Sequence, residues 1–159
     1  MIVACDGAAR GNPGPAGIGV HVTTADGGVA AEIGEGIGVA TNNLAEYTAV
    51  ITGLRRAAEL GATDVLVRSD SHLLVEQMSG RYRVKNPTLQ RLHAQAREVA
   101  SGFRRVRYEH VRREANKEAD RLANKGVDEW LAGEGAGYAP TEPGPRLWET
   151  DSTDSGERG

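Results

Sequence analysis

Three segments near the start of the chain have the apolar and polar patterns of strands: the first is a short apolar run, and the second alternates at Ile18, Val20 and Val22. The segments are residues 2–6, 17–24 and 29–37. Asp26-Gly27-Gly28 has the composition of a tight hairpin turn between the second and third segments. Residues 7–16 are rich in glycine and proline, which predicts a loop without strand pairing. We therefore expect an antiparallel meander whose first strand ends at Asp6.

The middle of the chain switches between helical and strand periodicity. Apolar residues recur every three to four positions in residues 44–60, 71–78, 88–100 and 115–131. Thr41-Asn42-Asn43 offers an N-cap for the first of these helices, and Gly61 ends it. Two more strands are expected at residues 64–70 and 103–111. The predicted order of elements is β-β-β-α-β-α-α-β-α.

Strands that are joined by helices imply right-handed parallel crossovers. The expected fold class is therefore α/β, with a five-stranded mixed sheet, the first strand beside the fourth, and helices on both faces. A chain of 159 residues has the length of one domain, and the periodic part covers residues 1–131. Residues 132–159 are dominated by Gly, Pro, Glu, Ser, Thr and Asp, which predicts a disordered tail or linker.

The apolar residues are too dispersed for a membrane protein. No run approaches the roughly 18 consecutive apolar residues of a membrane span, and the start of the chain lacks the pattern of a signal peptide. Cys5 is the one cysteine, which excludes an internal disulfide and a cysteine-based zinc cluster and suits a small buried strand residue. We expect a cytoplasmic monomer without an obligate protein partner.

Charge is segregated along the chain, although the net charge is only −3. Residues 81–126 contain 13 Lys and Arg against 5 Asp and Glu, whereas residues 1–80 contain 4 against 9 and residues 127–159 contain 2 against 8. A basic middle between acidic ends is typical of a protein that contacts nucleic acid. The alternative interpretation is an ordinary solvated face.

Four acidic residues are placed so that they could converge. Asp6 and Asp70 each follow an apolar strand, and parallel neighbouring strands would bring them to one sheet edge about 5 Å apart. Glu46 and Asp120 lie beside the apolar stripes of their helices and lean toward the sheet. Four carboxylates without a Cys or His cage suit two Mg²⁺ ions, with Mn²⁺ as a substitute. Two such ions about 3.5 to 4 Å apart catalyse phosphodiester hydrolysis in many nucleases.

Each acid also has a purely structural interpretation. Asp6 could form a turn, Asp70 could cap the second helix, and Glu46 could form a capping box with Asn43. Asp120 could pair with Arg121 or Lys117. Only the combination of two strand ends, two helix faces and a basic segment favours a shared metal site.

Four sequence blocks resemble the type I ribonuclease H family, and the match covers about residues 1–128. The blocks are Asp6-Gly7 with Gly11-Asn12-Pro13-Gly14-Pro15, then residues 41–46, Ser69-Asp70-Ser71, and residues 116–123. The resemblance implies the ribonuclease H-like fold and cleavage of the RNA strand of RNA/DNA hybrids, which leaves 5′-phosphate and 3′-hydroxyl ends. It also implies the metal ligands Asp6, Glu46, Asp70 and Asp120.

The resemblance also implies a set of residues that contact the hybrid. They are Gly7, Gly11, Asn12, Thr41, Asn42, Asn43, Ser71, His72, Lys85 and Asn116. Thr41 matches a residue that holds a DNA phosphate, and His72 stands where many members have glutamine. Arg113 resembles the arginine that replaces a catalytic loop histidine in a handle-less subgroup, while His110 falls in a predicted strand. Because a guanidinium cannot act as a base, Arg113 is expected to act through its charge.

The chain lacks the basic handle that grips the hybrid in some members. Residues 81–87 form a short basic connector, and we expect Arg81, Tyr82, Arg83 and Lys85 to replace part of the handle. The alternative interpretation of this segment is an ordinary solvated linker. We expect weaker and more salt-sensitive binding than in relatives that have a handle. Two alternatives to the hybrid-cutting endonuclease stay open at this point: a non-catalytic module that binds hybrids or double-stranded RNA, and a metal-dependent nuclease without hybrid preference.

Overall fold

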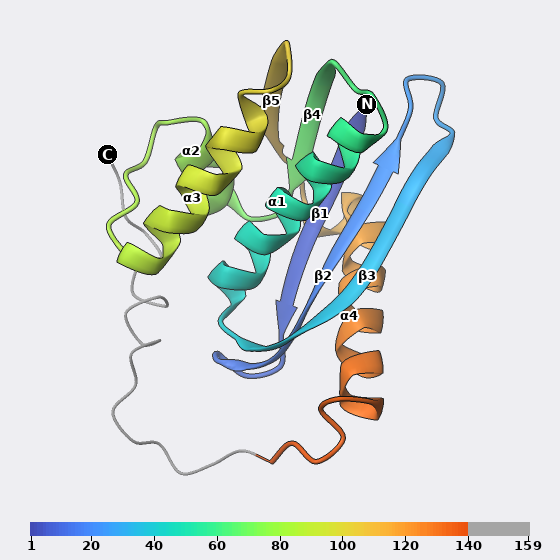
Figure 1. The fold of residues 1–159 in the computed structure, drawn as a ribbon, viewed down its shortest axis with the longest axis vertical. Coiled ribbons are helices and arrows are strands. Elements are labelled where there is room, and N and C mark those ends of the chain that lie inside the picture. Colours follow the sequence, from blue (N-terminus) through green and yellow to red (C-terminus); the bar gives the residue numbers. More distant parts are fainter. Residues whose placement is uncertain (140–159) are drawn as a thin grey trace.

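The computed structural model describes residues 1–139 (Figure 1). The first five elements are β1 (Ile2–Ala9), β2 (Gly14–Thr23), β3 (Val29–Ala40), α1 (Asn42–Glu59) and β4 (Asp64–Ser69). The others are α2 (His72–Met78), α3 (Pro87–Ala100), β5 (Arg105–His110), the 3₁₀ turn η1 (Arg113–Ala115) and α4 (Lys117–Ala132). Apart from this short turn, the element order is the one that the periodicity predicts.

The five strands form one mixed sheet in the order β3-β2-β1-β4-β5. β1 pairs antiparallel with β2 and parallel with β4, and β5 continues the parallel part. The predicted neighbourhood of the first and fourth strands is therefore confirmed. It follows from the α1 crossover, which returns the chain to the sheet in the parallel sense.

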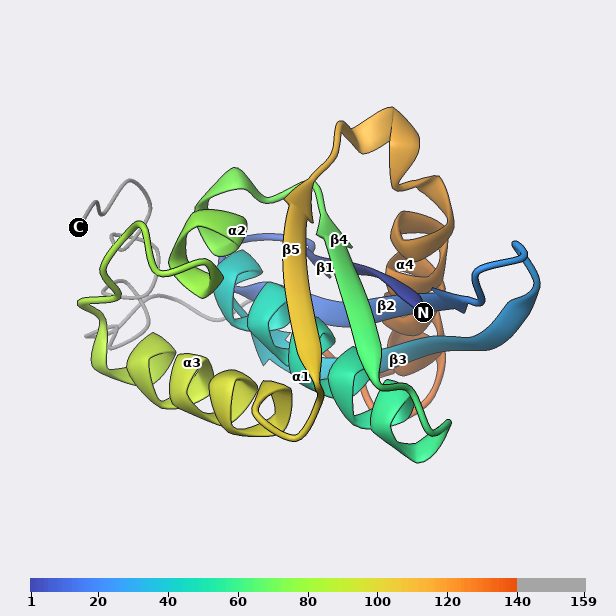
Figure 2. The same cartoon turned by 90° about the horizontal axis from the view of Figure 1, so that it is seen from above.

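Helices cover both faces of the sheet (Figures 1 and 2). α1 packs on β1 and β2 and also contacts α3, whereas α4 packs on β2, β3 and β1 from the opposite side. The α4 contact is close because glycines in β2 carry no side chain: a Cβ on Gly19 would lie 1.9 Å from the carbonyl oxygen of Ala119. The main core lies under α1, where Val3, Val20 and Leu54 are fully buried.

The first strand is longer than the sequence analysis predicts. β1 does not end at Asp6 but continues to Ala9, and residues 7–9 pair with residues 16–18 of β2. The prediction of an unpaired loop over residues 7–16 is therefore wrong for most of its length, because glycine and alanine are small enough to continue the ladder against β2. The hairpin at Asp26-Gly27-Gly28 is confirmed, and Gly27 has a φ of 89°.

Part of the predicted tail has a defined structure. α4 includes residue 132, and the following residues make turns in which the Gly135 amide donates to the carbonyl of Trp130 at 2.7 Å. The rings of Trp130 and Tyr138 lie 6.1 Å apart. The rest of the predicted tail, residues 140–159, lies outside the described residues. Among residues 1–139, no helix has both the length and the apolar character that a membrane crossing needs.

Candidate active site

Asp6 and Asp70 are neighbours because of the register between β1 and β4. The last paired residues of the two strands are Cys5 and Ser69, so the next residue of each chain segment is an aspartate. Asp6 lies within β1, because this strand continues to pair with β2 beyond that residue. Only 7% of the Asp6 surface is exposed. Asp70 follows the end of β4 and precedes Ser71, the N-cap of α2.

Glu46 joins them from the start of α1. Thr41 caps this helix by accepting a hydrogen bond from the Leu44 amide at 3.2 Å. The helix lies directly on Gly7, since a Cβ there would be 2.4 Å from the Glu46 nitrogen. As a result, Asp6, Glu46 and Asp70 bring one carboxylate oxygen each to within 4.8 Å of one another.

Asp120 reaches the group through Asp6. Its helix, α4, is anchored by Asn116, whose Nδ2 donates to the Cys5 carbonyl at 2.9 Å. Asp120 lies one turn further along α4, where its carboxyl is near enough to that of Asp6 to help raise the Asp6 pKa. The structure thus brings all four predicted carboxylates together, with three in one tight group and the fourth beside Asp6.

The structural interpretations of these acids are not what the structure shows. Asp6 lies in a strand rather than a turn. The caps of α2 and α1 are Ser71 and Thr41 rather than Asp70 and Asn43. Arg121 forms its ion pairs with Glu32 and Glu118.

Asp6, Glu46 and Asp70 hold protons more tightly than usual. Burial, followed by the charge of Asp70, raises the pKa of Asp6 well above its usual range. Burial and the same neighbour raise the pKa of Glu46 to about 8. Burial also raises the pKa of Asp70, while the Arg113 guanidinium acts in the opposite direction. A divalent cation would relieve this repulsion, and an all-oxygen donor set fits Mg²⁺ or Mn²⁺.

The carboxylates face an open cavity of about 330 Å³. The lining residues include Gly7, Asn42, Ser71, His110 and Arg113. Arg113 is mostly exposed, and its Nε atom lies 3.8 Å from an Asp70 carboxylate oxygen. His110 is the last residue of β5, as its strand pattern predicts, but no local pattern in the sequence indicates that this strand ends at the cavity.

Asn12 and Asn42 tie the β1–β2 turn to the start of α1. The Asn12 Oδ1 atom accepts a hydrogen bond from the Asn42 amide at 2.9 Å, and the Asn42 Oδ1 atom accepts one from the Ala9 amide at 3.1 Å. Both side-chain oxygens are therefore engaged within the protein. Their NH₂ groups remain as the hydrogen-bond donors that each side chain can direct toward a substrate.

Other predicted substrate residues do not line this cavity. Asn116 is 2% exposed and lies beneath the carboxylates, and Thr41 is 1% exposed and serves as a cap. Gly11 lies in the β1–β2 turn with a φ of 103°. His72 is on α2, where its ring meets that of His110 at 5.4 Å, and Lys85 is in the basic connector before α3. Their contacts with a substrate stay predictions.

A mixed sheet in this strand order, with carboxylates at the junction of β1, β4, α1 and α4, defines a ribonuclease H-like domain. A family model described as "Reverse transcriptase-like" matches residues 4–126. The chain is 54% identical over 129 residues to "Bifunctional protein Rv2228c" of Mycobacterium tuberculosis, which covers 80% of the chain and 35% of that relative. It is 46% identical over 124 residues to "Ribonuclease HI" of Halobacterium salinarum, which covers 78% of the chain and 62% of the relative.

Solved structures agree with these relatives. The structure of LC11-RNase H1 in complex with an RNA/DNA hybrid superposes with a TM-score of 0.78 at 41% identity, over 82% of this chain and 98% of that one. The chain belongs to the ribonuclease H family, which confirms the resemblance found in the sequence. It spans about a third of the length of the mycobacterial relatives that it matches.

Proposed function

We propose that this domain hydrolyses the RNA strand of RNA/DNA hybrids and leaves 5′-phosphate and 3′-hydroxyl ends. The observation that carries the proposal is the convergence of Asp6, Glu46 and Asp70 within 4.8 Å at an open cavity. A non-catalytic binding module would have no use for carboxylates in this position, because they repel phosphate. The hybrid bound by LC11-RNase H1 supports the choice of substrate.

Asp6, Glu46, Asp70 and Asp120 would hold two Mg²⁺ ions, for which Mn²⁺ could substitute. When bound, these ions would activate the attacking water and stabilise the leaving 3′ oxygen. The Asp6 and Asp70 carboxylates are held in place at the cavity, since β1 and β4 are paired up to the residues before them. This rigidity keeps the reacting groups aligned.

Arg113 acts through its charge rather than as a base. It lines the cavity, and a guanidinium does not serve as a general base. From this position it attracts the scissile phosphate or the released 5′-phosphate.

Discrimination between RNA and DNA rests on the residues around the β1–β2 turn. The NH₂ groups of Asn12 and Asn42 would donate to a 2′-hydroxyl oxygen or to acceptors at minor-groove base edges. Gly7 lines the cavity and Gly11 lies in the β1–β2 turn, so their backbone would lie near the RNA sugar. Further contacts with the hybrid would come from Asn43, Ser71 and His72, at the starts of α1 and α2. Thr41 would help to hold a phosphate of the DNA strand.

The basic connector would hold the hybrid backbone. Arg81 is paired with Glu76, with its Nη2 atom 2.9 Å from a carboxylate oxygen. The buried Gln77 side chain donates to the Arg83 carbonyl at 3.3 Å, which holds the connector against α2. Lys85 presents a further cation before α3. We also propose a cytoplasmic monomer.

Asp70→Asn protein tests the function when it is assayed with Mg²⁺ on hybrid, double-stranded RNA and DNA. We expect the wild-type protein to cleave the hybrid and neither of the other two substrates. The variant should cleave the hybrid at least about a hundredfold more slowly and still bind it. Unchanged hydrolysis in Asp70→Asn would exclude the metal mechanism. Equal cleavage of all three substrates would favour the nuclease without hybrid preference.

A further inference from the structure

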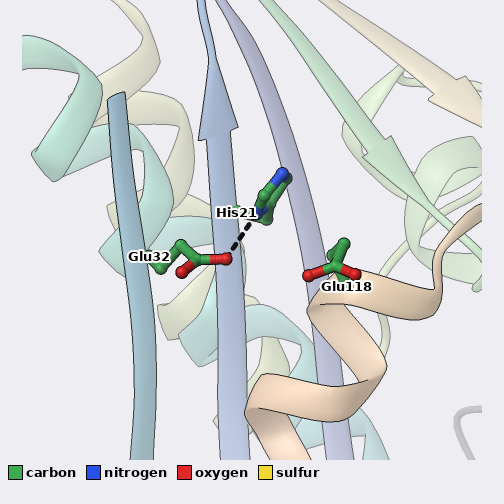
Figure 3. A group of neighbouring side chains, drawn as sticks. All are labelled: His21, Glu32 and Glu118. Carbon is green, nitrogen blue, oxygen red and sulfur yellow. Dashed lines mark hydrogen bonds and ion pairs between the residues drawn. The ribbon is translucent and has the colours of Figure 1, made fainter. Parts of the chain in front are cut away.

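A second group of potential metal ligands lies away from the carboxylate site, at the start of α4. His21 of β2, Glu32 of β3 and Glu118 of α4 each bring one ligand atom to within 4.8 Å of the others (Figure 3). His21 and Glu32 are cross-strand partners, and the His21 Nδ1 atom is 3.1 Å from the Glu32 Oε2 atom. Figure 3 shows the three side chains converging from three elements.

The two glutamates already converge on one positive charge. The Nη2 atom of Arg121 lies 3.2 Å from the Glu32 Oε2 atom and 2.9 Å from the Glu118 Oε2 atom. The arginine therefore marks the point where the carboxylates favour a cation. Its own side chain is about half exposed, so it can swing into solvent at little cost.

A cavity of about 280 Å³ adjoins this group, and His21 and Glu118 are among its lining residues. Asn116 lines the same cavity, is 2% exposed, and has a buried Oδ1 atom without a hydrogen-bond partner among the described residues. A buried carbonyl oxygen without a donor is costly. A small shift of the Asn116 side chain toward the cavity would let a water molecule bound to a metal ion there supply that donor.

We propose that His21, Glu32 and Glu118 bind a divalent transition-metal ion of the Zn²⁺ type, which takes the place of the Arg121 guanidinium. One imidazole nitrogen and two carboxylate oxygens, with water completing the shell, form a donor set that suits Zn²⁺. Mg²⁺ demands oxygen ligands and does not compete well for an imidazole. The bound ion would link β2, β3 and α4. The site is separate from the proposed nuclease activity and does not rest on it.

Calorimetric titration with Zn²⁺ in a large excess of Mg²⁺ tests the proposal, because Mg²⁺ would occupy the all-oxygen carboxylate site. We expect one Zn²⁺ per chain, and affinity that falls at least about tenfold in His21→Gln and in Glu118→Gln. Glu129→Gln is the matched control, since Glu129 is also an exposed glutamate of α4 and pairs with Lys125. Equal Zn²⁺ affinity in wild type and both ligand variants would overturn the proposal.

Arg121→Gln gives a test in the opposite direction. If the guanidinium competes with the metal, its removal raises Zn²⁺ affinity by about tenfold, whereas a purely structural ion-pair network predicts no gain. Histidine-ring NMR signals identify the ligand directly, because Zn²⁺ should shift those of His21. Shifts confined to His72 and His110, whose rings are 5.4 Å apart, would place the metal elsewhere and refute the assignment.

Discussion

Gly7 lies so close to Glu46 that a Cβ atom on the glycine would come within 2.4 Å of the Glu46 backbone nitrogen. The contact joins β1, which carries Asp6, to the first turns of α1. Gly7 therefore sets how near the Glu46 carboxylate comes to that of Asp6, and its missing side chain is part of the active-site geometry.

Gly7→Ala should accordingly damage both activity and stability. The new methyl group would collide with the backbone of Ala45 and Glu46, so α1 must shift. We expect the shift to lower the free energy of unfolding by about 1 to 3 kcal/mol and kcat by at least about tenfold. Urea unfolding and steady-state kinetics on hybrid measure the two effects. Gly102→Ala is the control, because its Cβ would meet only the Val99 carbonyl at 3.4 Å. A normal kcat in Gly7→Ala would show that the position of Glu46 does not depend on this contact.

The metal-free domain should lose stability as the pH rises from about 5 to about 8. The raised pKa values of Asp6, Glu46 and Asp70 mean that the folded domain holds protons in this range which the unfolded chain has released. The folded state is therefore favoured at the lower pH, and its advantage disappears as the pH rises through the folded pKa values. Urea unfolding in EDTA measures the trend, and added Mg²⁺ should reverse the loss.

Asp70→Asn isolates the carboxyl contribution to this trend. Burial lowers the pKa of His93, which acts in the opposite direction because its charging opposes folding at low pH. That effect is common to both proteins and cancels in the comparison. The variant should lose less stability than wild type over the same range. An identical decline in both would contradict the assignment to the carboxylate group.

Asn12→Asp should separate hydrogen-bond donation from the structural role of this side chain. In the wild-type domain the Asn42 amide donates to the Asn12 Oδ1 atom at 2.9 Å. The variant keeps an oxygen that can accept this hydrogen bond but replaces the NH₂ donor by a charged acceptor. We expect an unchanged melting temperature and a fall of about ten- to a hundredfold in kcat/KM on hybrid. Asn12→Ala serves for comparison, since it also removes the contact with α1. Full activity in Asn12→Asp would exclude donation by this residue.

Arg113→Ala should reduce turnover without affecting stability. Its side chain is 84% exposed, so little packing is lost, but the cavity loses a cation 3.8 Å from Asp70. We expect kcat to fall by about tenfold and Arg113→Lys to recover part of it. Arg107→Ala on the exposed side of β5 provides the control. A shift of the pH optimum with unchanged maximal kcat would argue against this electrostatic role.

Lys85→Ala should weaken hybrid binding at low salt more than at high salt. Loss of one phosphate contact reduces the slope of log affinity against log salt by about 1. Binding titrations at several salt concentrations measure it, with Lys125→Ala on α4 as the control. An unchanged slope would show that the connector does not touch the phosphate backbone.

Local patterns in the sequence account for most of the fold. Period-two spacing or a short apolar run predicts each strand, and period-3.6 spacing predicts the major helices, because each element buries apolar residues against a single core. Boundaries were less accurate where pairing decides them: β1 reaches Ala9 since β2 offers partners for residues 7–9, and nothing local to this glycine-rich stretch indicates those partners.

The four carboxylates could be named from the sequence because their strand ends, helix faces and surrounding blocks are local features. Residue types and order along the chain thus determined the fold class, the family and the four carboxylates that we propose as metal ligands. Only the tertiary structure decided which oxygens converge, that Asn116 lies beneath the site, and that His21, Glu32 and Glu118 meet. Those relationships depend on register and on helix packing between segments up to about a hundred residues apart, which no local pattern records.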